Sequence, residues 1–268
     1  MKFDLFYYNQ LSQTQKKIYA HQLKHFLDEH LGLPYAIPIK VAKPQELLQV
    51  YNALFLDNTS SLLPAMNTIA AYRDGDKCVL TSELEPCSIN EDKEVQEILD
   101  VLRGKINNYS NSIFDKVTYA TRLLSERTCY YLKNNGEGET PYSVLLKHSG
   151  YCTGIARTTR ALLSNDIVCV RGYLKKEFSI VKEKEGEKGV PHIWNALFYN
   201  GEWIFFDACQ NILTANNTVV ATELDREFYR RNYLPCGRYE PPKFTTLNQI
   251  KAKYILEDEK LWSKKFFQ

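Results

Sequence analysis

Apolar residues recur at helical spacing in several stretches of the first part of the chain. Residues 12–31 carry one such stripe, and an S-x-x-Q capping box stands at its start. A short helix is expected at 44–55, and residues 91–133 predict two helices that are broken near Asn107–Asn111. The first part of the chain is therefore expected to be mostly helical.

Residues 32–90, which include the short helix expected at 44–55, have a mixed pattern. Pro34, Pro38 and Pro44 interrupt it and predict a loop-rich entry to the second helix. In residues 71–80, AYRDGDKCVL, an Asp-Gly pair separates two candidate strands and predicts a hairpin turn.

The pattern changes in the second part of the chain. Residues 142–164 lead into a helix, and apolar, β-branched or aromatic runs predict strands at 167–174, 192–199 and 202–207. The tail, 223–268, mixes helical spacing with a Pro-Pro break.

This change of pattern predicts an α+β fold with a boundary near residue 105. Residues 1–105 are expected to form a mostly helical N-terminal region. Residues 106–268 are expected to form an α+β region in which a helix packs on an antiparallel sheet. The sequence contains no run of apolar residues long enough to span a membrane as a helix.

The last two predicted strands are separated by Asn200-Gly201, a pair typical of two-residue hairpin turns because both turn positions need a positive φ. A loop of fixed length sets the register, so His192 is expected to face Cys209 and to lie diagonal to Asp207 on the same face. Diagonal neighbours are about 7–8 Å apart at the backbone, within reach of an aromatic ring and a carboxylate. The hairpin therefore predicts an imidazole paired with a carboxylate, which orients the ring and stabilises the imidazolium.

A cysteine precedes the predicted helix of the second part. Cys152 follows Gly150, and Asn165 is a suitable C-terminal stop, which places Cys152 at the helix N-terminus. Free peptide N–H groups and the helix dipole favour a thiolate there, and the Cys152 N–H is a natural oxyanion donor. Gly150 allows close approach of a substrate or another segment. The helix has an apolar stripe formed by Ile155, Ala156, Leu162 and Leu163.

Each of these three side chains has an ordinary structural explanation when it is taken alone. Cys152 could be a small buried residue, His192 a structural histidine and Asp207 a residue that ends a strand. Their combination favours nucleophilic catalysis by a thiolate. The order along the chain is a helix that begins with the cysteine, a strand, a strand with the histidine, a turn and a strand that ends with the aspartate.

These motifs resemble the core of the transglutaminase-like superfamily, which is related in fold to the papain-like cysteine proteases. The superfamily pattern combines a G-x-C helix, a strand that ends in Gly-aromatic, an H-x-W-N strand, a short turn and G-x-W-x-x-x-D. Over residues 150–208 the chain matches it through GYC, Gly172-Tyr173, HIWN and GEWIFFD. The opening FYYNQLSQTQKKIY and the helix around Asp115-Lys116 are similar to the front half of longer bacterial proteins of this type.

The resemblance implies a papain/transglutaminase-like core and assigns roles to the site. Cys152 would be the nucleophile, His192 the general base and acid, and Asp207 the acid that orients the histidine. Trp194 would flank the site, and Trp194 and Tyr151 are the candidate substrate-binding residues.

The chain departs from the family pattern after the aspartate. Many relatives have a Thr and an aromatic residue there, whereas this chain has Ala208 and Cys209. Cys209 is either a second thiol in the site or a buried structural cysteine. The charged segment 175–191, between the central strand and His192, is either a mobile lid or a solvated loop.

Composition narrows the functional classes. The net charge of +2 and the interspersed charges do not call for a nucleic-acid or membrane partner. Seven cysteines without a C-x-x-C pair indicate a reduced protein with mostly buried thiols, and no apolar signal core follows the N-terminus, so a cytoplasmic location is expected. His21 and His25 are interpreted as a solvated helix face and no calcium-loop pattern occurs, so no metal or cofactor is assigned.

The sequence thus favours a cysteine-dependent hydrolase, a peptidase or amidase, that acts on a peptide or protein substrate through a thioester. Two alternatives remain. The first is an acyl transferase that passes the same acyl group to an amine, and the second is a non-catalytic binding protein on the same fold.

Overall fold

The computed structural model describes residues 5–130, 137–163, 167–174, 190–199, 202–209, 212 and 233–235. Three features predicted from the sequence lie outside these residues. They are the Asn200-Gly201 turn itself, residues 175–189 of the charged segment, and most of the tail with its Pro-Pro break.

The predicted helices of the N-terminal region are present. The 3₁₀ turn η1 (Tyr8–Gln10) precedes α1 (Gln13–Leu23), which continues into the π-helical turn η2 (Lys24–Asp28). The capping box at the start of α1 is confirmed: the Ser12 side chain accepts from the Gln15 N–H, and the Gln15 side chain accepts from the Ser12 N–H. Helix α2 (Pro44–Asp57) begins with a proline at its first turn, where the missing N–H costs nothing.

A three-stranded antiparallel sheet accompanies these helices, in the order β1-β3-β2. The predicted hairpin is confirmed as β2 (Ile69–Asp74) and β3 (Lys77–Ser82), although its two-residue loop is Gly75-Asp76, with Gly75 at a φ of 55°. Strand β1 (Tyr35–Pro38) lies in the segment predicted as a loop, and that prediction was wrong. Pro38, the last residue of β1, is tolerated because β1 is an edge strand of the sheet.

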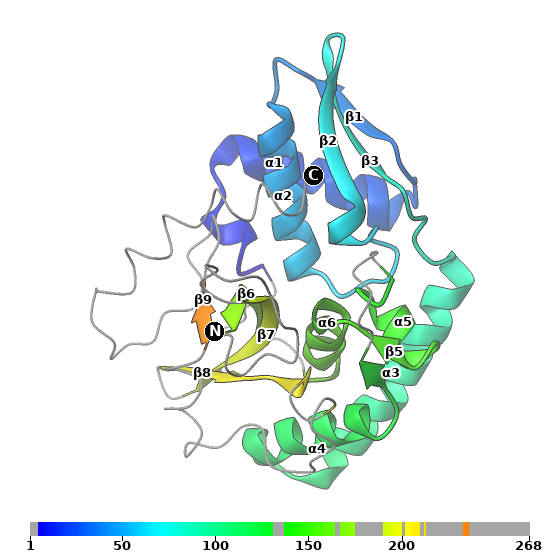
Figure 1. Cartoon of the computed structure of the whole chain (residues 1–268), viewed down its shortest axis with the longest axis vertical. Coiled ribbons are helices and arrows are strands. Elements are labelled where there is room, and N and C mark those ends of the chain that lie inside the picture. Colours follow the sequence, from blue (N-terminus) through cyan, green and yellow to red (C-terminus); the bar gives the residue numbers. More distant parts are fainter. Residues whose placement is uncertain are drawn as a thin grey trace.

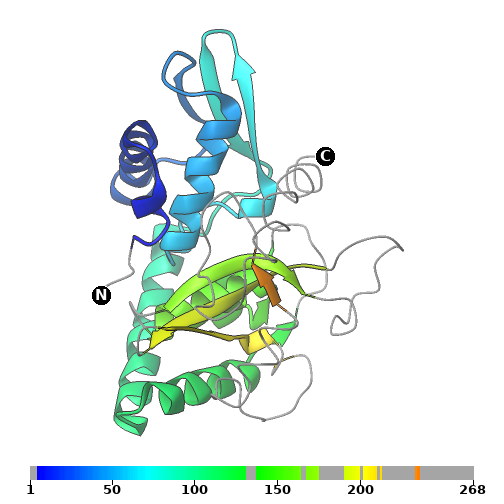
Figure 2. The same cartoon turned by 90° about the vertical axis from the view of Figure 1, so that its left-hand side faces the viewer.

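Two helices follow the 3₁₀ turn η3 (Met66–Thr68) and the hairpin, as predicted. Helix α3 (Ile89–Tyr109) and helix α4 (Ile113–Ser125) are separated by a short break. Figure 2 shows α3 running from beside the N-terminal region to α4 at the base of the molecule. The boundary predicted near residue 105 falls inside α3, and the division into two regions stays a prediction.

The segment after α4 departs from the helical prediction for 91–133. Strand β4 (Cys129–Tyr130) pairs in parallel with β5 (Ser149–Gly150), so the helical prediction was wrong at 129–130. The short helix α5 (Pro141–Leu145) precedes β5 along the chain. The β4–β5 pair brings the end of the α4 segment next to the residues that enter the cysteine-bearing helix.

The second part of the structure confirms the predicted α+β arrangement, a cysteine-bearing helix packed on an antiparallel sheet. The four-stranded sheet has the order β8-β7-β6-β9, and all neighbouring strands are antiparallel. Helix α6 (Cys152–Leu163) contacts β7 and β6, and in Figure 1 it lies between this sheet and helices α3 and α5. The strands are β6 (Ile167–Leu174), β7 (Val190–Tyr199), β8 (Glu202–Phe206) and β9 (Tyr233–Pro235).

One hydrophobic core joins the helical N-terminal region to the α6 layer. It contains Leu54 and Phe55 of α2 together with Ile155 of α6 and Val170 of β6. A hydrogen bond of 2.6 Å from the Tyr7 hydroxyl to the Cys169 carbonyl links the two parts as well. Within the described residues, no helix is both long and apolar enough to cross a bilayer.

Candidate active site

Helix α6 places Cys152 at its first position, as the sequence predicts. The Tyr151 carbonyl accepts the Ile155 N–H at 3.0 Å, which is the first bond of the helix. The Cys152 side chain is buried, at 2% exposure. The thiol therefore lies beside the unpaired N–H groups of a helix N-terminus, shielded from bulk water.

The helix itself is buried on every face, which its amphipathic pattern did not predict. Thr158 and Thr159 satisfy their hydroxyls within the helix, by donating to the Gly154 and Ile155 carbonyls at 2.7 and 2.8 Å. Because its polar groups are satisfied internally or by neighbouring loops, α6 can sit in the centre of the core.

The N-terminal turn of α6 has a second layer of backbone packed directly on it. The Tyr151 N–H donates to the Gly138 carbonyl at 2.8 Å. A Cβ at Gly154 would collide with the same carbonyl oxygen, and a Cβ at Gly150 would lie 2.8 Å from a Val144 methyl. The close approach that the sequence predicts at Gly150 therefore involves another segment of this chain, which fixes the backbone on both sides of Cys152.

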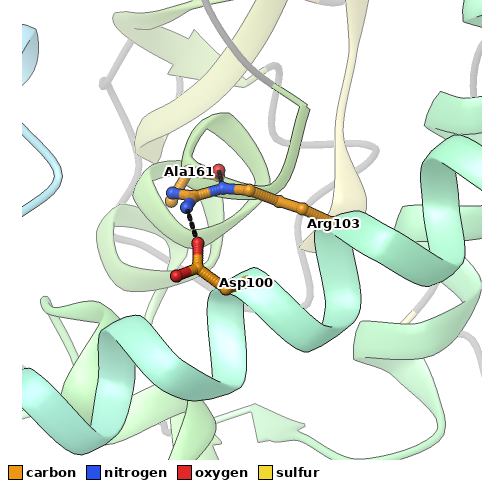
Figure 3. Close-up of polar contacts among 3 residues, drawn as sticks. All are labelled: Asp100, Arg103 and Ala161. Carbon is orange, nitrogen blue, oxygen red and sulfur yellow. Dashed lines mark hydrogen bonds and ion pairs between the residues drawn. The ribbon is translucent and has the colours of Figure 1, made fainter.

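The other end of α6 is held by a side chain from α3. The Arg103 guanidinium donates from Nε to the Ala161 carbonyl at 2.8 Å and from Nη1 to the Asp100 carboxylate at 2.7 Å (Figure 3). The Ala161 carbonyl is in the last turn of α6, where carbonyls have no partner within the helix and where a cation is favourable to the dipole. Arg103 thereby anchors the helix at the end opposite to Cys152.

The hairpin β7–β8 has the predicted register. Tyr199 pairs with Glu202 and Asn195 with Phe206. This register brings His192 and Asp207 together, and the imidazole Nε2–H donates to Asp207 Oδ2 at 2.6 Å. Both side chains are buried, with exposures of 6% for His192 and 1% for Asp207. The predicted imidazole–carboxylate pair is confirmed as a contact.

The imidazole links the carboxylate to the thiol. The His192 ring is hydrogen-bonded to Asp207 through Nε2 and also makes a side-chain hydrogen bond with Cys152. Burial lowers the pKa of His192, but the Asp207 carboxylate and Cys152 outweigh it and raise the pKa to about 10. The structure thus brings together the three side chains predicted from the sequence, and it favours an imidazolium at His192 beside the Asp207 carboxylate.

The aspartate is itself held in place. Its Oδ1 accepts the Cys209 N–H at 2.9 Å, while Oδ2 accepts from His192. Cys209 is fully buried, and burial, Asp207 and Cys152 all raise the pKa of its thiol well above the usual value. The proximity of Cys209 to His192 that the hairpin register predicts is confirmed, since its sulfur is within 4.8 Å of the ligand atoms of His192 and Asp207.

The two candidate substrate-binding residues differ in exposure. Trp194 is fully buried, and its ring stacks on His192 with centroids 6.3 Å apart, so it supports the imidazole. Tyr151 is half-buried and makes a ring contact with Tyr130 at 5.8 Å. A role in substrate binding stays a prediction for both.

Tyr130 is a site residue that the sequence did not indicate. It pairs with Gly150 through the parallel β4–β5 ladder, two positions before Cys152. Burial, Cys152 and Cys209 raise the pKa of the Tyr130 hydroxyl, which places this phenol beside both thiols and keeps it protonated. No local signal could have found it, because the contact depends on the pairing of two very short strands.

The six cysteines in the described residues are all free. Four of them, Cys78, Cys152, Cys169 and Cys209, are buried. This fits the expectation of mostly buried thiols for the part of the chain that the structure describes.

Comparison with protein-family models and with curated proteins found no match to this chain. Solved structures gave partial similarities. A protein described as a TGase aligns with a TM-score of 0.37 and 15% identity, over 52% of this chain and 43% of its own. A putative cysteine protease from Cytophaga hutchinsonii aligns with a TM-score of 0.33 and 12% identity, over 57% of this chain and 64% of its own. Since both TM-scores are below 0.5, a functional assignment depends on the site geometry and the sequence motifs.

Proposed function

We propose that the protein is a cysteine-dependent enzyme in which the Cys152 thiolate attacks the carbonyl carbon of a peptide or amide. The observation that carries this proposal is the continuous chain of contacts from Asp207 through His192 to Cys152. An imidazole held between a carboxylate and a thiol is the arrangement that activates a cysteine nucleophile.

The roles follow from the contacts. His192 takes the thiol proton and holds it on the nitrogen that faces Cys152, and it later gives that proton to the leaving amine. Asp207 keeps the ring in one orientation through the 2.6 Å bond and stabilises its positive charge. The attack forms a thioester on Cys152 and releases the amine, and hydrolysis by water then restores the thiolate.

The start of α6 supplies an oxyanion donor. The Cys152 N–H is at the first position of the helix, where it has no partner within the helix, and it points with the helix dipole toward a developing negative charge. The Gly138 carbonyl and the Gly150 close packing hold this backbone in place, so the donor is preorganised.

Hydrolysis of a peptide or amide is the favoured reaction, on the resemblance of the GYC, HIWN and GEWIFFD motifs to the transglutaminase-like superfamily. A second candidate is transfer of the acyl group to an amine. The observation in its favour is burial: Cys152 is 2% exposed and His192 is 6% exposed, and a thioester kept from water persists long enough for an amine to attack.

Thiol reactivity tests the proposal without a known substrate. The folded protein is treated with iodoacetamide and with a panel of acyl-directed peptide probes at neutral pH, and the labelled cysteines are located by mass spectrometry. Cys152 is expected to react faster than Cys129, although Cys129 is exposed and Cys152 is buried. His192→Ala should slow the labelling of Cys152 by about 10²-fold or more and leave Cys129 unchanged.

The best probes then provide a substrate for turnover. Cys152→Ala is expected to abolish turnover while the melting temperature stays close to that of the parent protein. Added primary amines that divert the product from acid to amide would favour acyl transfer over hydrolysis. Equal labelling of Cys152 in the parent protein and in folded His192→Ala would contradict an activated pair and would favour the non-catalytic binding protein.

A further inference from the structure

A second cluster of possible ligand atoms includes the same imidazole, together with Asp207 and Cys209. His192, Asp207 and Cys209 each offer one ligand atom, and these atoms all lie within 4.8 Å of one another. The three residues are buried, at 6%, 1% and 0% exposure. The proposed chemistry uses His192 and Asp207 but gives no role to the sulfur of Cys209.

One nitrogen, one carboxylate oxygen and one sulfur form a ligand set that suits zinc. Zn²⁺ binds imidazole nitrogen, carboxylate oxygen and thiolate sulfur at about 2.0–2.3 Å, which puts neighbouring ligand atoms about 3.3–3.7 Å apart in a tetrahedral site. The present separation of 2.6 Å between His192 Nε2 and Asp207 Oδ2 therefore has to open by less than about 1 Å. The Cys209 sulfur, which lies within 4.8 Å of the other two ligand atoms, has to approach them by about 1 Å at most.

Charge makes the buried position acceptable. A Zn²⁺ ion with one thiolate, one carboxylate and one neutral imidazole nitrogen has no net charge, so burial of the whole group avoids the cost of an isolated ion. Mg²⁺ prefers oxygen ligands in an octahedral arrangement and does not fit a set that contains sulfur and nitrogen.

The cluster also has the supporting contacts that zinc ligands usually have. Asp207 Oδ1 is fixed by the Cys209 N–H at 2.9 Å, and the Cys152 side chain is hydrogen-bonded to His192. Such outer contacts orient a carboxylate and an imidazole toward the ion. Trp194 stacks on the imidazole and restricts its rotation.

We propose that His192 Nε2, Asp207 and Cys209 Sγ form a zinc-binding site, and that zinc there blocks the enzyme reversibly. Binding replaces the proton on Nε2 and the thiol proton of Cys209, which leave to solvent, and the carboxylate exchanges its bond to the imidazole for the metal. Three protein ligands leave a fourth position for water. The inhibition rests on the proposed function, because zinc would take His192 and Asp207 away from their roles beside Cys152. The binding of zinc itself does not rest on that function.

Binding is measured on the full-length protein with Zn²⁺ alone, by calorimetry and by competition with a chromogenic chelator. Co²⁺ serves as a spectroscopic probe, since a thiolate ligand gives a charge-transfer band in the near ultraviolet. The variants are Cys209→Ala, which removes the sulfur, and Cys152→Ala, which removes the proposed nucleophile. Cys87→Ala is the matched control, because Cys87 lies in the N-terminal region outside the cluster.

The parent protein, Cys152→Ala and Cys87→Ala are each expected to bind one tight equivalent of zinc and to show the cobalt–thiolate band. Cys209→Ala should lose both, and Mg²⁺ should not compete. Binding that survives in Cys209→Ala, or that disappears in Cys152→Ala, would overturn the site, the latter by showing that the ion uses the nucleophile instead. These measurements do not depend on enzymatic activity. Zinc binding through Cys209 in a protein whose Cys152 is not labelled by the thiol probes would therefore contradict only the proposed function.

Discussion

At the scale of single residues, the most informative groups are charged side chains that the helical pattern would place at the surface. Arg157 of α6 is fully buried, and its guanidinium donates to the carbonyls of Asn58, Ser60 and Glu139 at 2.8–3.2 Å. It also lies 3.8 Å above the ring of Phe55. Arg157 therefore ties the site helix to the loop that follows α2, and the carbonyl dipoles of that loop and of Glu139 stabilise its positive charge.

Glu139 is the matching buried acid next to this arginine. Its Oε2 accepts the Asn67 N–H at 3.2 Å, while Oε1 has no hydrogen-bond partner among the described residues. Burial raises the pKa of Glu139 from 4.5 to about 7, despite opposing contributions from the Asn67 N–H and Arg157. Glu139 connects the loop that packs on α6 to the N-terminal region.

Glu139 predicts a pH dependence of stability. Because its pKa is higher in the folded chain, the folded state keeps a proton that the unfolded chain releases, so this group's contribution to the free energy of unfolding decreases as the pH rises from 4.5 to about 7. Glu139→Gln stays neutral and should gain stability relative to the parent protein by about 3 kcal/mol between pH 4 and pH 8. Urea denaturation of both proteins at several pH values measures this difference, and a difference that does not vary with pH would rule out the assigned shift.

At the scale of elements, the position of helix α6 is fixed by contacts at its two ends. The N-terminal turn depends on the absence of a side chain at Gly154, and the C-terminal turn depends on Arg103 from α3. The two ends allow separate tests, each with a control residue in α3.

Gly154→Ala is expected to destabilise the protein by about 1–3 kcal/mol, because the added methyl collides with the Gly138 carbonyl and must displace the backbone before Cys152. Gly104→Ala is the control, since nothing lies within 4 Å of a Cβ at that helical position. It should stabilise the protein by about 0.5–1 kcal/mol through helix propensity. Chemical denaturation of both variants measures the change in the free energy of unfolding, which should have opposite signs. A Gly154→Ala variant as stable as the parent protein would contradict the packing at the site helix.

Arg103→Ala is expected to cost about 1.5 kcal/mol, because it leaves the carbonyl of the buried Ala161 at the end of α6 without a charged donor. Asp100→Ala removes the exposed partner of the same arginine and should change stability by less than about 0.5 kcal/mol. Thermal denaturation at low and high salt separates the two effects. A loss in Asp100→Ala as large as that in Arg103→Ala would mean that the ion pair, not the helix contact, carries the stability.

At the scale of the whole molecule, the helical N-terminal region and the α6 layer share one hydrophobic core. Polar contacts also connect the two parts: Arg157 donates to the Asn58 carbonyl, Glu139 accepts the Asn67 N–H, and the Tyr7 hydroxyl donates to the Cys169 carbonyl. Helix α3 runs through the boundary predicted at residue 105. The shared core suggests that the site is stabilised by contacts with the first part of the chain.

The shared core predicts one cooperative unfolding transition for the two parts. In a Trp262→Phe variant, tryptophan fluorescence reports on Trp194 and Trp203 in the sheet, whereas far-ultraviolet circular dichroism is dominated by the helices, including those of the N-terminal region. The two signals should give the same midpoint in urea. Two separate midpoints would instead support independent units on either side of residue 105.

The sequence by itself determined the features that follow local rules. The capping box of α1 and the two-helix pattern of α3 and α4 are set by residues close together in the chain. The two-residue loop predicted at Asn200-Gly201 gives the β7–β8 register that the strands have, and this register brings His192 to Asp207 and Cys209. The position of Cys152 at a helix start follows from the periodicity after it. Local geometry of this kind needs no knowledge of distant segments.

Only the tertiary structure decided the surroundings of this site. The edge strand β1 and the β4–β5 pair form because distant strands offer them partners, so propensity along the chain could not reveal them. The same pairing brings Tyr130 to the thiols. The burial of Arg157 and Glu139 is decided by backbone carbonyls and N–H groups from far along the chain, and a sequence pattern contains no information on where those groups will lie.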